Sequence, residues 1–116
     1  MASANLFNND IYSDEDLDAI WKKAAVTPNS DPSTWRKDVA GAWIKRSEYG
    51  NRDSEYGWEV DHIIPKSKGG KTELGNLRPL QHQNNASKGN NYPEWVAVVT
   101  SDGRVHNTDC SKKIRE

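Results

Sequence analysis

An aspartate and a histidine stand side by side at positions 61 and 62, and two asparagines follow them along the chain. Asn76 lies 14 residues after His62, and Asn85 lies 23 residues after it. Hydrolysis of a phosphodiester needs a base that works near neutral pH, and an imidazole with an ordinary pKa of about 6.5 suits this task. The reaction also needs a hard divalent cation, which prefers oxygen ligands, and Asp61 and Asn85 each offer one. The segment therefore contains the side chains of a metal-dependent phosphodiester hydrolase.

A longer pattern surrounds these four residues. Residues 61–70 read DHIIPKSKGG, residues 76–80 read NLRPL, and Asn85 is followed by Lys88 and Gly89. In these stretches and in their spacing the sequence resembles the HNH endonuclease family, and the resemblance covers roughly residues 57–90. It implies a ββα-metal (HNH) core. We therefore expect an α+β fold in which an N-terminal helix and a C-terminal β-hairpin pack around that core.

The resemblance implies a role for each residue of the pattern. His62 is expected to be the general base that activates water. Asp61 and Asn85 are expected to hold the metal. The side chain of Asn76 is expected to bond the backbone across the loop and so fix the orientation of His62. Lys88, near the end of the helix, is expected to hold the scissile or an adjacent phosphate.

Other basic side chains are candidates for contacts with the nucleic-acid backbone. These candidates are Arg36, Lys66, Lys68 and Arg78. A solvated loop is an equal alternative for the two lysines, and Arg36 could pair with Asp38 or Glu59 instead of a phosphate. His82 lies three residues before Asn85 and could be an extra ligand, although a partly exposed helix histidine is the simpler reading.

The expected cofactor is one divalent cation, Mg²⁺ or Mn²⁺, and no structural zinc. Many HNH proteins bind zinc through two Cys-x-x-Cys pairs, but this chain has a single cysteine, Cys110. Gln81 and Asn84 stand where one of those pairs would be. Five tryptophans and four tyrosines offer large areas for burial. We therefore expect aromatic packing to take the place of the zinc.

The chain of 116 residues is expected to be a single domain over residues 1–116. Residues 1–31 carry two lysines against six carboxylates, and residues 32–116 carry fourteen Lys and Arg against eleven carboxylates. A basic working part is compatible with phosphate binding. The sequence lacks a signal-peptide pattern and an apolar run of membrane-span length. We therefore expect a cytoplasmic protein with no membrane partner.

Local signals predict the elements that position these residues. A capping box at residues 13–16 starts a helix whose apolar face holds Leu17, Ile20 and Trp21, and which ends before Thr27. Further predicted elements are strands at 42–46, 58–63 and 95–100, an extended stretch at 77–80, a helix at 81–88 and a hairpin turn at 101–104. Residues 1–12 are expected to be an irregular leader and residues 107–116 a frayed tail.

The sequence predicts a divalent-metal-dependent HNH endonuclease that acts on nucleic acid, most simply on double-stranded DNA. One metal site cuts one strand, so a monomer or weak dimer is expected to nick its substrate. The resemblance implies products with a 5′-phosphate and a 3′-hydroxyl. A metal-dependent RNase is an alternative, because neither the metal nor the base reads the sugar. A non-catalytic nucleic-acid-binding module is the alternative from another class.

Overall fold

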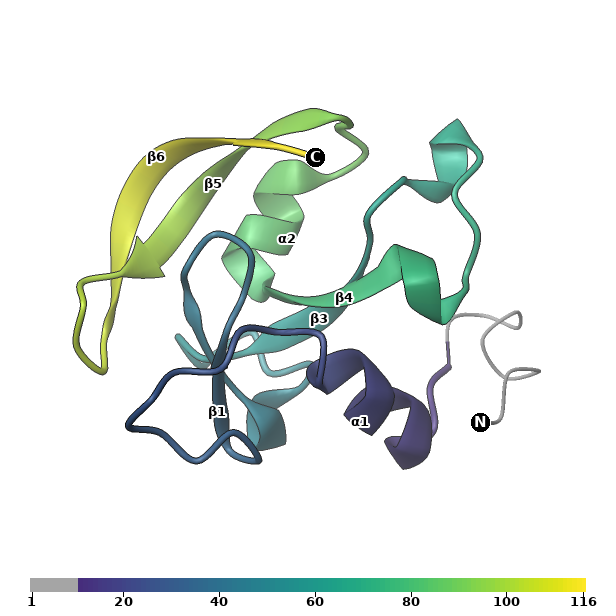
Figure 1. Cartoon of the computed structure of the whole chain (residues 1–116). Coiled ribbons are helices and arrows are strands. Elements are labelled where there is room, and N and C mark those ends of the chain that lie inside the picture. Colours follow the sequence, from purple (N-terminus) through teal and green to yellow (C-terminus); the bar gives the residue numbers. More distant parts are fainter. Residues whose placement is uncertain (1–10) are drawn as a thin grey trace.

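The computed structural model describes residues 11–116, and these form a mixed α+β molecule (Figure 1). The helices in this range are α1 (Asp14–Trp21) and α2 (His82–Lys88). The strands form three antiparallel pairs: β1 (Trp35–Lys37) with β2 (Trp43–Lys45), β3 (Trp58–His62) with β4 (Leu77–Gln81), and β5 (Glu94–Ser101) with β6 (Asn107–Arg115). Short 3₁₀ turns lie at η2 (Arg46–Glu48), η3 (Lys66–Lys68) and η4 (Leu74–Asn76). The α+β class predicted from the sequence is confirmed.

The predicted capping box starts α1. The Ser13 hydroxyl accepts the Asp16 amide at 3.1 Å, and the Asp16 carboxylate accepts the Ser13 amide at 3.4 Å. These two bonds satisfy amides that have no partner within the first turn of the helix. The apolar face of α1 then buries Leu17, Ile20 and Trp21.

The strand β4 connects two hydrophobic cores, and all five of its residues are buried. Leu77 belongs to the core that contains α1, in which the Trp21 and Trp58 rings lie 5.3 Å apart. Leu80 belongs to the core under the β5–β6 hairpin, together with Trp95. Figure 1 shows α2 between that hairpin and the β3–β4 pair. Strand β4, which pairs with β3, therefore packs into both cores.

The β3–β4 hairpin and α2 are continuous in the chain. Strand β3 ends at His62, and a loop over residues 63–76 returns to β4. Helix α2 follows β4 directly, and the Gln81 side chain caps it by accepting the amides of Gln83 at 2.8 Å and Asn84 at 3.2 Å. Gly89 ends the helix, and its positive φ of 51° suits a residue without a Cβ. This compact connection brings α2 against β3.

The predicted frayed tail is wrong, because residues 107–115 form β6. The Asn107 side chain accepts the Trp43 amide at 2.7 Å and donates to the Trp43 carbonyl at 3.0 Å, which ties the start of the strand to β2. Ile114 is buried in the second core. The polar composition of this segment gave no strand signal, but pairing with β5 and these two anchors order it. Strand β1 was not predicted as a strand either.

The predicted leader falls mostly on residues 1–10, which lie outside the described residues. Residues 11 and 12 have no regular secondary structure. Neither helix of the described range has the length and apolar character needed to cross a bilayer.

Candidate active site

Side chains from β3 and α2 line one open pocket of about 250 Å³. Asp61 and His62 come from the end of β3, Asn85 comes from the middle of α2, and Lys66 comes from η3. A second open pocket, of about 350 Å³, adjoins the first because both are lined by His62 and Asn85. Three of the residues predicted to do chemistry therefore face one solvent-accessible space.

His62 is half-buried at the edge of this pocket. Its Nε2 lies 2.9 Å from the hydroxyl of Thr72, which is almost fully buried in the loop between β3 and β4. The His62 carbonyl accepts a hydrogen bond of 2.9 Å from Lys88 Nζ. Sequence reasoning missed Thr72, because nothing in its local pattern distinguishes it from the other polar residues of the loop.

Asn76 joins the two ends of the loop. Its Oδ1 accepts the Ile64 amide at 2.9 Å, and its Nδ2 donates to the carbonyls of Ile64 and Lys71, both at 3.0 Å. A Cβ on Gly70 would lie 1.7 Å from the Ile64 carbonyl oxygen, and Gly69 has a φ of +89°. The predicted backbone contacts of Asn76 are present, and the Gly-Gly pair is what lets the loop close around them.

Asp61 is buried between two cations. Its Oδ2 lies 2.9 Å from Arg78 Nε, and its Oδ1 lies 3.0 Å from Lys88 Nζ. Arg78 also holds the Glu116 carboxylate with both terminal nitrogens, and Trp95 donates to that carboxylate at 2.9 Å. Burial lowers the pKa of the Arg78 guanidinium, but its bonds and charge contacts with Glu116 and Asp61 outweigh burial and raise it.

Two of the predicted contacts with the nucleic-acid backbone, Arg78 and Lys88, have partners inside the protein instead. Arg78 is buried against Asp61 and Glu116, and Lys88 is fully buried against Asp61 and the His62 carbonyl. Arg36 is half-buried and donates to the carbonyls of Pro32, Lys22 and Ala24, and no ion pair joins it to Asp38 or Glu59 among the described residues. The shared acceptor of Arg78 and Lys88, the Asp61 carboxylate, is buried, whereas the hydrogen bonds of Arg36 are exposed or part-buried. Lys66 and Lys68 are exposed on η3.

Asn85 has a partner that sequence reasoning did not identify. Its Nδ2 donates to Glu59 Oε1 at 2.9 Å, and Glu59 is held by Arg52 at 2.7 Å. Burial raises the pKa of Glu59, but the hydrogen bonds from Arg52 and Asn85 outweigh burial and lower it. His82, the other side chain considered near Asn85, has its Nε2 2.9 Å from the Ser54 carbonyl oxygen.

The donor set fits a magnesium or manganese ion. Within residues 11–116 no three His, Cys, Asp or Glu side chains are grouped to hold a metal. Asp61 and Asn85 instead offer one carboxylate and one amide oxygen beside open space, and Mg²⁺ is commonly bound by one or two carboxylates with water and substrate phosphate. A carboxylate has about four acceptor positions, so the two ion pairs of Asp61 leave room for an ion.

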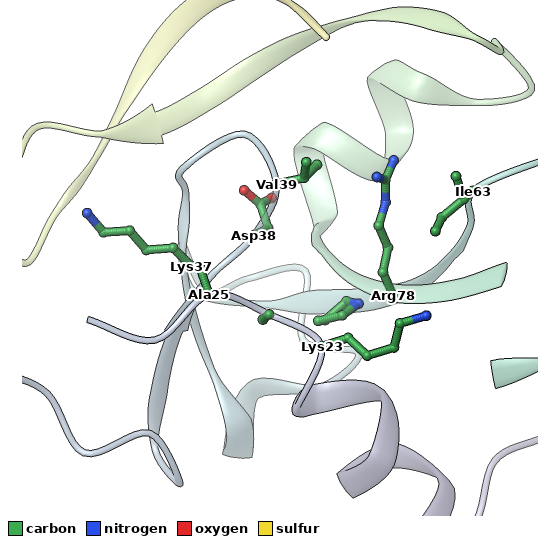
Figure 2. Close-up of a pocket in the computed structure, with 9 residues that line it drawn as sticks. Lys23, Ala25, Lys37, Asp38, Val39, Ile63 and Arg78 are labelled. Carbon is green, nitrogen blue, oxygen red and sulfur yellow. The ribbon is translucent and has the colours of Figure 1, made fainter. Parts of the chain in front are cut away.

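A different hollow, of about 370 Å³, is not lined by Asp61, His62 or Asn85 (Figure 2). Figure 2 shows Lys23 and Arg78 on one of its walls and Asp38 and Val39 on another. Lys23 donates to the Leu74 and Leu77 carbonyls, and burial followed by the charge of Arg78 lowers its pKa. The chemistry of the lining residues, and not the size of the cavity, therefore separates the candidate active site from this hollow.

The comparison with known families decides the identity of this region. Residues 48–91 match the family model of the HNH endonucleases, and this range holds β3, β4, α2 and the pocket residues Asp61, His62 and Asn85. The chain carries an HNH endonuclease domain. The comparisons with curated proteins and with solved structures gave no match. A domain of this family implies nuclease-type activity on nucleic acid and, in general, the use of a divalent metal.

A buried polar network surrounds Gln81 and Asn84, the two positions compared from the sequence with a zinc-binding cysteine pair. Asp38 accepts the amides of Ala40, Ala42 and Gln81 and the Nδ2 of Asn84, at 2.9–3.1 Å. Burial is the largest influence on Asp38 and raises the pKa of its carboxyl, although these four donors oppose it.

Asn84 extends the same network to β5. Its Oδ1 accepts the amides of Val98 at 2.9 Å and Val99 at 3.0 Å, and its Nδ2 also donates to the Val99 carbonyl at 2.9 Å. The β5–β6 pairing is irregular between Ala97 and Val99, where Asn84 takes these backbone groups. The HNH domain is thus fastened to the C-terminal hairpin by hydrogen bonds as well as by aromatic packing.

Proposed function

We propose that this protein is a divalent-metal-dependent endonuclease that hydrolyses phosphodiester bonds in DNA. We further propose that β3, β4 and α2 are its ββα-metal core. The observation that carries the proposal is the convergence of Asp61, His62 and Asn85 on one open pocket within the range that matches the HNH family. A base and two oxygen ligands beside a space open to substrate are what the reaction requires.

Asp61 and Asn85 would hold the ion, and Asn76 would keep the loop after His62 in place. A bound Mg²⁺ or Mn²⁺ supplies neutralisation of the charge that develops on the phosphate and stabilisation of the leaving oxygen. Asp61 enters the reaction already oriented, because Arg78 and Lys88 hold one carboxylate oxygen each.

His62 would take the proton of the attacking water. The Thr72 hydroxyl, 2.9 Å from Nε2, can accept a proton carried on that nitrogen. This tautomer has its lone pair on Nδ1, where it can act as the base. Thr72 would therefore help to fix the orientation of the ring, and in this tautomer its hydroxyl accepts the proton on Nε2.

The substrate proposed is double-stranded DNA, cut in one strand at each encounter to leave a 5′-phosphate and a 3′-hydroxyl. The exposed side chains of Lys66 and Lys68 support the proposal, because Lys66 lines the pocket and Lys68 is on the same turn. Lysines at such a position add attraction to the phosphate backbone. We place the protein in the cytoplasm as a monomer or weak dimer.

A plasmid assay tests this function. Purified protein with Mn²⁺ or Mg²⁺ is expected to convert supercoiled plasmid to open circles, EDTA is expected to stop the conversion, and His62→Ala protein purified in parallel excludes a contaminating nuclease. If folded protein converts no plasmid with any divalent ion but binds DNA, the non-catalytic binding module replaces this proposal. Cleavage of RNA much faster than of DNA of the same sequence would instead favour the RNase.

A further inference from the structure

The amide of Asn85 must be turned the right way to bind a cation. Its side chain ends in one oxygen, which accepts, and one NH₂ group, which only donates. A metal ion binds the oxygen and is repelled by the NH₂ group. A rotation of the amide by half a turn exchanges the two without moving the helix. The affinity for metal thus depends on what holds the amide in one orientation.

The carboxylate of Glu59 decides this orientation. Glu59 Oε1 lies 2.9 Å from Asn85 Nδ2. Because an ionised carboxylate can only accept hydrogen bonds, the NH₂ group has to face Glu59, and Oδ1 has to face away from it. Among the residues the structure describes, no hydrogen bond reaches Asn85 Oδ1, while Asn85 lines the pocket that contains Asp61 and His62.

Arg52 holds Glu59 in turn. Its Nε lies 2.7 Å from Glu59 Oε2, and one terminal nitrogen lies 3.2 Å from Oε1. The Glu59 side chain is 19% exposed, although Arg52 itself is largely exposed. A fork of two parallel bonds fixes the plane of a carboxylate better than a single bond does. The contacts therefore run from Arg52 through Glu59 to Asn85.

We propose that Glu59 is a positioning residue that turns the oxygen of Asn85 toward the bound metal, and that Arg52 keeps Glu59 in place for this task. The inference rests on the proposed function, because it takes Asn85 as a metal ligand. Glu59 acts here through Asn85 and does not itself touch the ion.

The substitution Glu59→Gln tests the orientation. Arg52 can only donate, so it should hold the oxygen of the new glutamine and leave its NH₂ group facing Asn85. The Asn85 amide should then invert. Calorimetric titration of the full chain with Mn²⁺ is expected to show an affinity about 10- to 100-fold weaker, the range typical for loss of a residue that orients a metal ligand.

Glu48→Gln is the matched control. Glu48 Oε2 accepts an amide hydrogen of Asn51 at 2.7 Å, so the substitution changes the same charge and the same kind of contact away from the pocket. Its affinity for Mn²⁺ is expected to equal that of the wild type. Circular dichroism confirms that every variant is folded before titration.

The same substitution in an Asn85→Asp variant distinguishes an effect on amide orientation from the other roles that Glu59 could play. Asn85→Asp has two equivalent oxygens, so its orientation no longer matters. In that background Glu59→Gln should weaken Mn²⁺ binding only slightly, through loss of a neighbouring negative charge, and much less than it does beside Asn85. If Glu59→Gln weakens Mn²⁺ binding equally in both backgrounds, Glu59 is a ligand or a structural residue and the inference is overturned.

Asn85→Ala distinguishes failure of the inference from failure of the proposed ligand set. If Asn85→Ala binds Mn²⁺ as tightly as the wild type, Asn85 is not a ligand, and both the assignment and the inference fall. If Asn85→Ala loses Mn²⁺ while Glu59→Gln behaves like Glu48→Gln, the ligand assignment stands and the positioning role alone is wrong.

Discussion

Asp61 is the residue on which the charges of the site converge. Arg78 and Lys88 each hold one of its oxygens, and Glu116 balances the second charge of the cluster. This buried arrangement keeps the carboxylate oriented, but it also places two positive charges beside the proposed position of the metal. We therefore expect metal alone to bind modestly and the negative phosphate of the substrate to strengthen its binding.

The roles of base and ligand are separable by substitution. His62→Ala should lower the rate of plasmid cleavage by about 10²- to 10⁴-fold, the usual contribution of a general base, and should leave the affinity for Mn²⁺ unchanged. Asp61→Ala should weaken Mn²⁺ binding itself. Calorimetry and the plasmid assay on the same preparations check both statements.

Asp61→Ala also leaves Arg78 and Lys88 without their shared partner, which is costly for buried charges. Asp61→Asn preserves the shape of the side chain and is the fairer comparison if the alanine variant is unstable. Retention of Mn²⁺ by both Asp61 variants, together with its loss in His62→Ala, would show that the two roles are assigned the wrong way round.

At the scale of elements, Asn84 joins α2 to β5. Its side-chain amide makes hydrogen bonds with three backbone groups of β5. The Asp38 carboxylate accepts hydrogen bonds from the Asn84 side chain and from the backbone amide of Gln81, the residue that caps α2. The short helix that carries Asn85 is thus set against the hairpin by a polar network that needs no metal.

Asn84→Ala should therefore destabilise the fold. It removes the partner of two β5 amides, Val99, which is buried, and Val98, which is part-buried, and each orphaned buried group costs about 1–3 kcal/mol. We expect the free energy of unfolding, measured by urea denaturation, to fall by about 3 kcal/mol or more. Asn91→Ala, the same change at an exposed position just beyond α2, should have little effect. If Asn84→Ala lowers the free energy of unfolding as little as Asn91→Ala does, the Asn84 network contributes no stability.

At the scale of the whole molecule, stability comes from two apolar cores that share β4. Trp21 and Trp58 pack in one core and Trp95 in the other, so aromatic side chains fill much of the interior. The proposed site lies on an open surface outside both cores. We therefore expect a metal bound at such a surface to serve substrate binding and chemistry rather than the stability of the fold.

Removal of metal should consequently separate activity from folding. EDTA is expected to abolish plasmid cleavage while the circular dichroism spectrum and the thermal unfolding midpoint stay unchanged. Domains whose fold is held by zinc behave differently, because their folding depends on the metal. Loss of structure on chelation, or one tightly bound zinc for each chain by elemental analysis, would reveal a structural site that the proposal does not include.

The side chains proposed for catalysis could be identified from the sequence because they lie within one hairpin and the helix that follows it. Asp61, His62, Asn76 and Asn85 are separated by short, fixed intervals, and the Gly-Gly pair and the capping signals mark the turns between them. Contacts within so short a segment are largely local. Spacing therefore carried the information about the pocket, and the predicted contacts of Asn76 were found.

The tertiary structure decided which partners these side chains have. Arg78 and Lys88 are of residue types that commonly bind phosphate. The register of β4, however, places Arg78 opposite Asp61, and Glu116 contacts it from 38 residues further along the chain. The roles proposed for Thr72 and Glu59 rest on contacts with His62 and Asn85 that exist only in the folded chain. Residue type states what a side chain can bind, whereas strand register and packing determine which acceptor lies within reach and whether water is excluded.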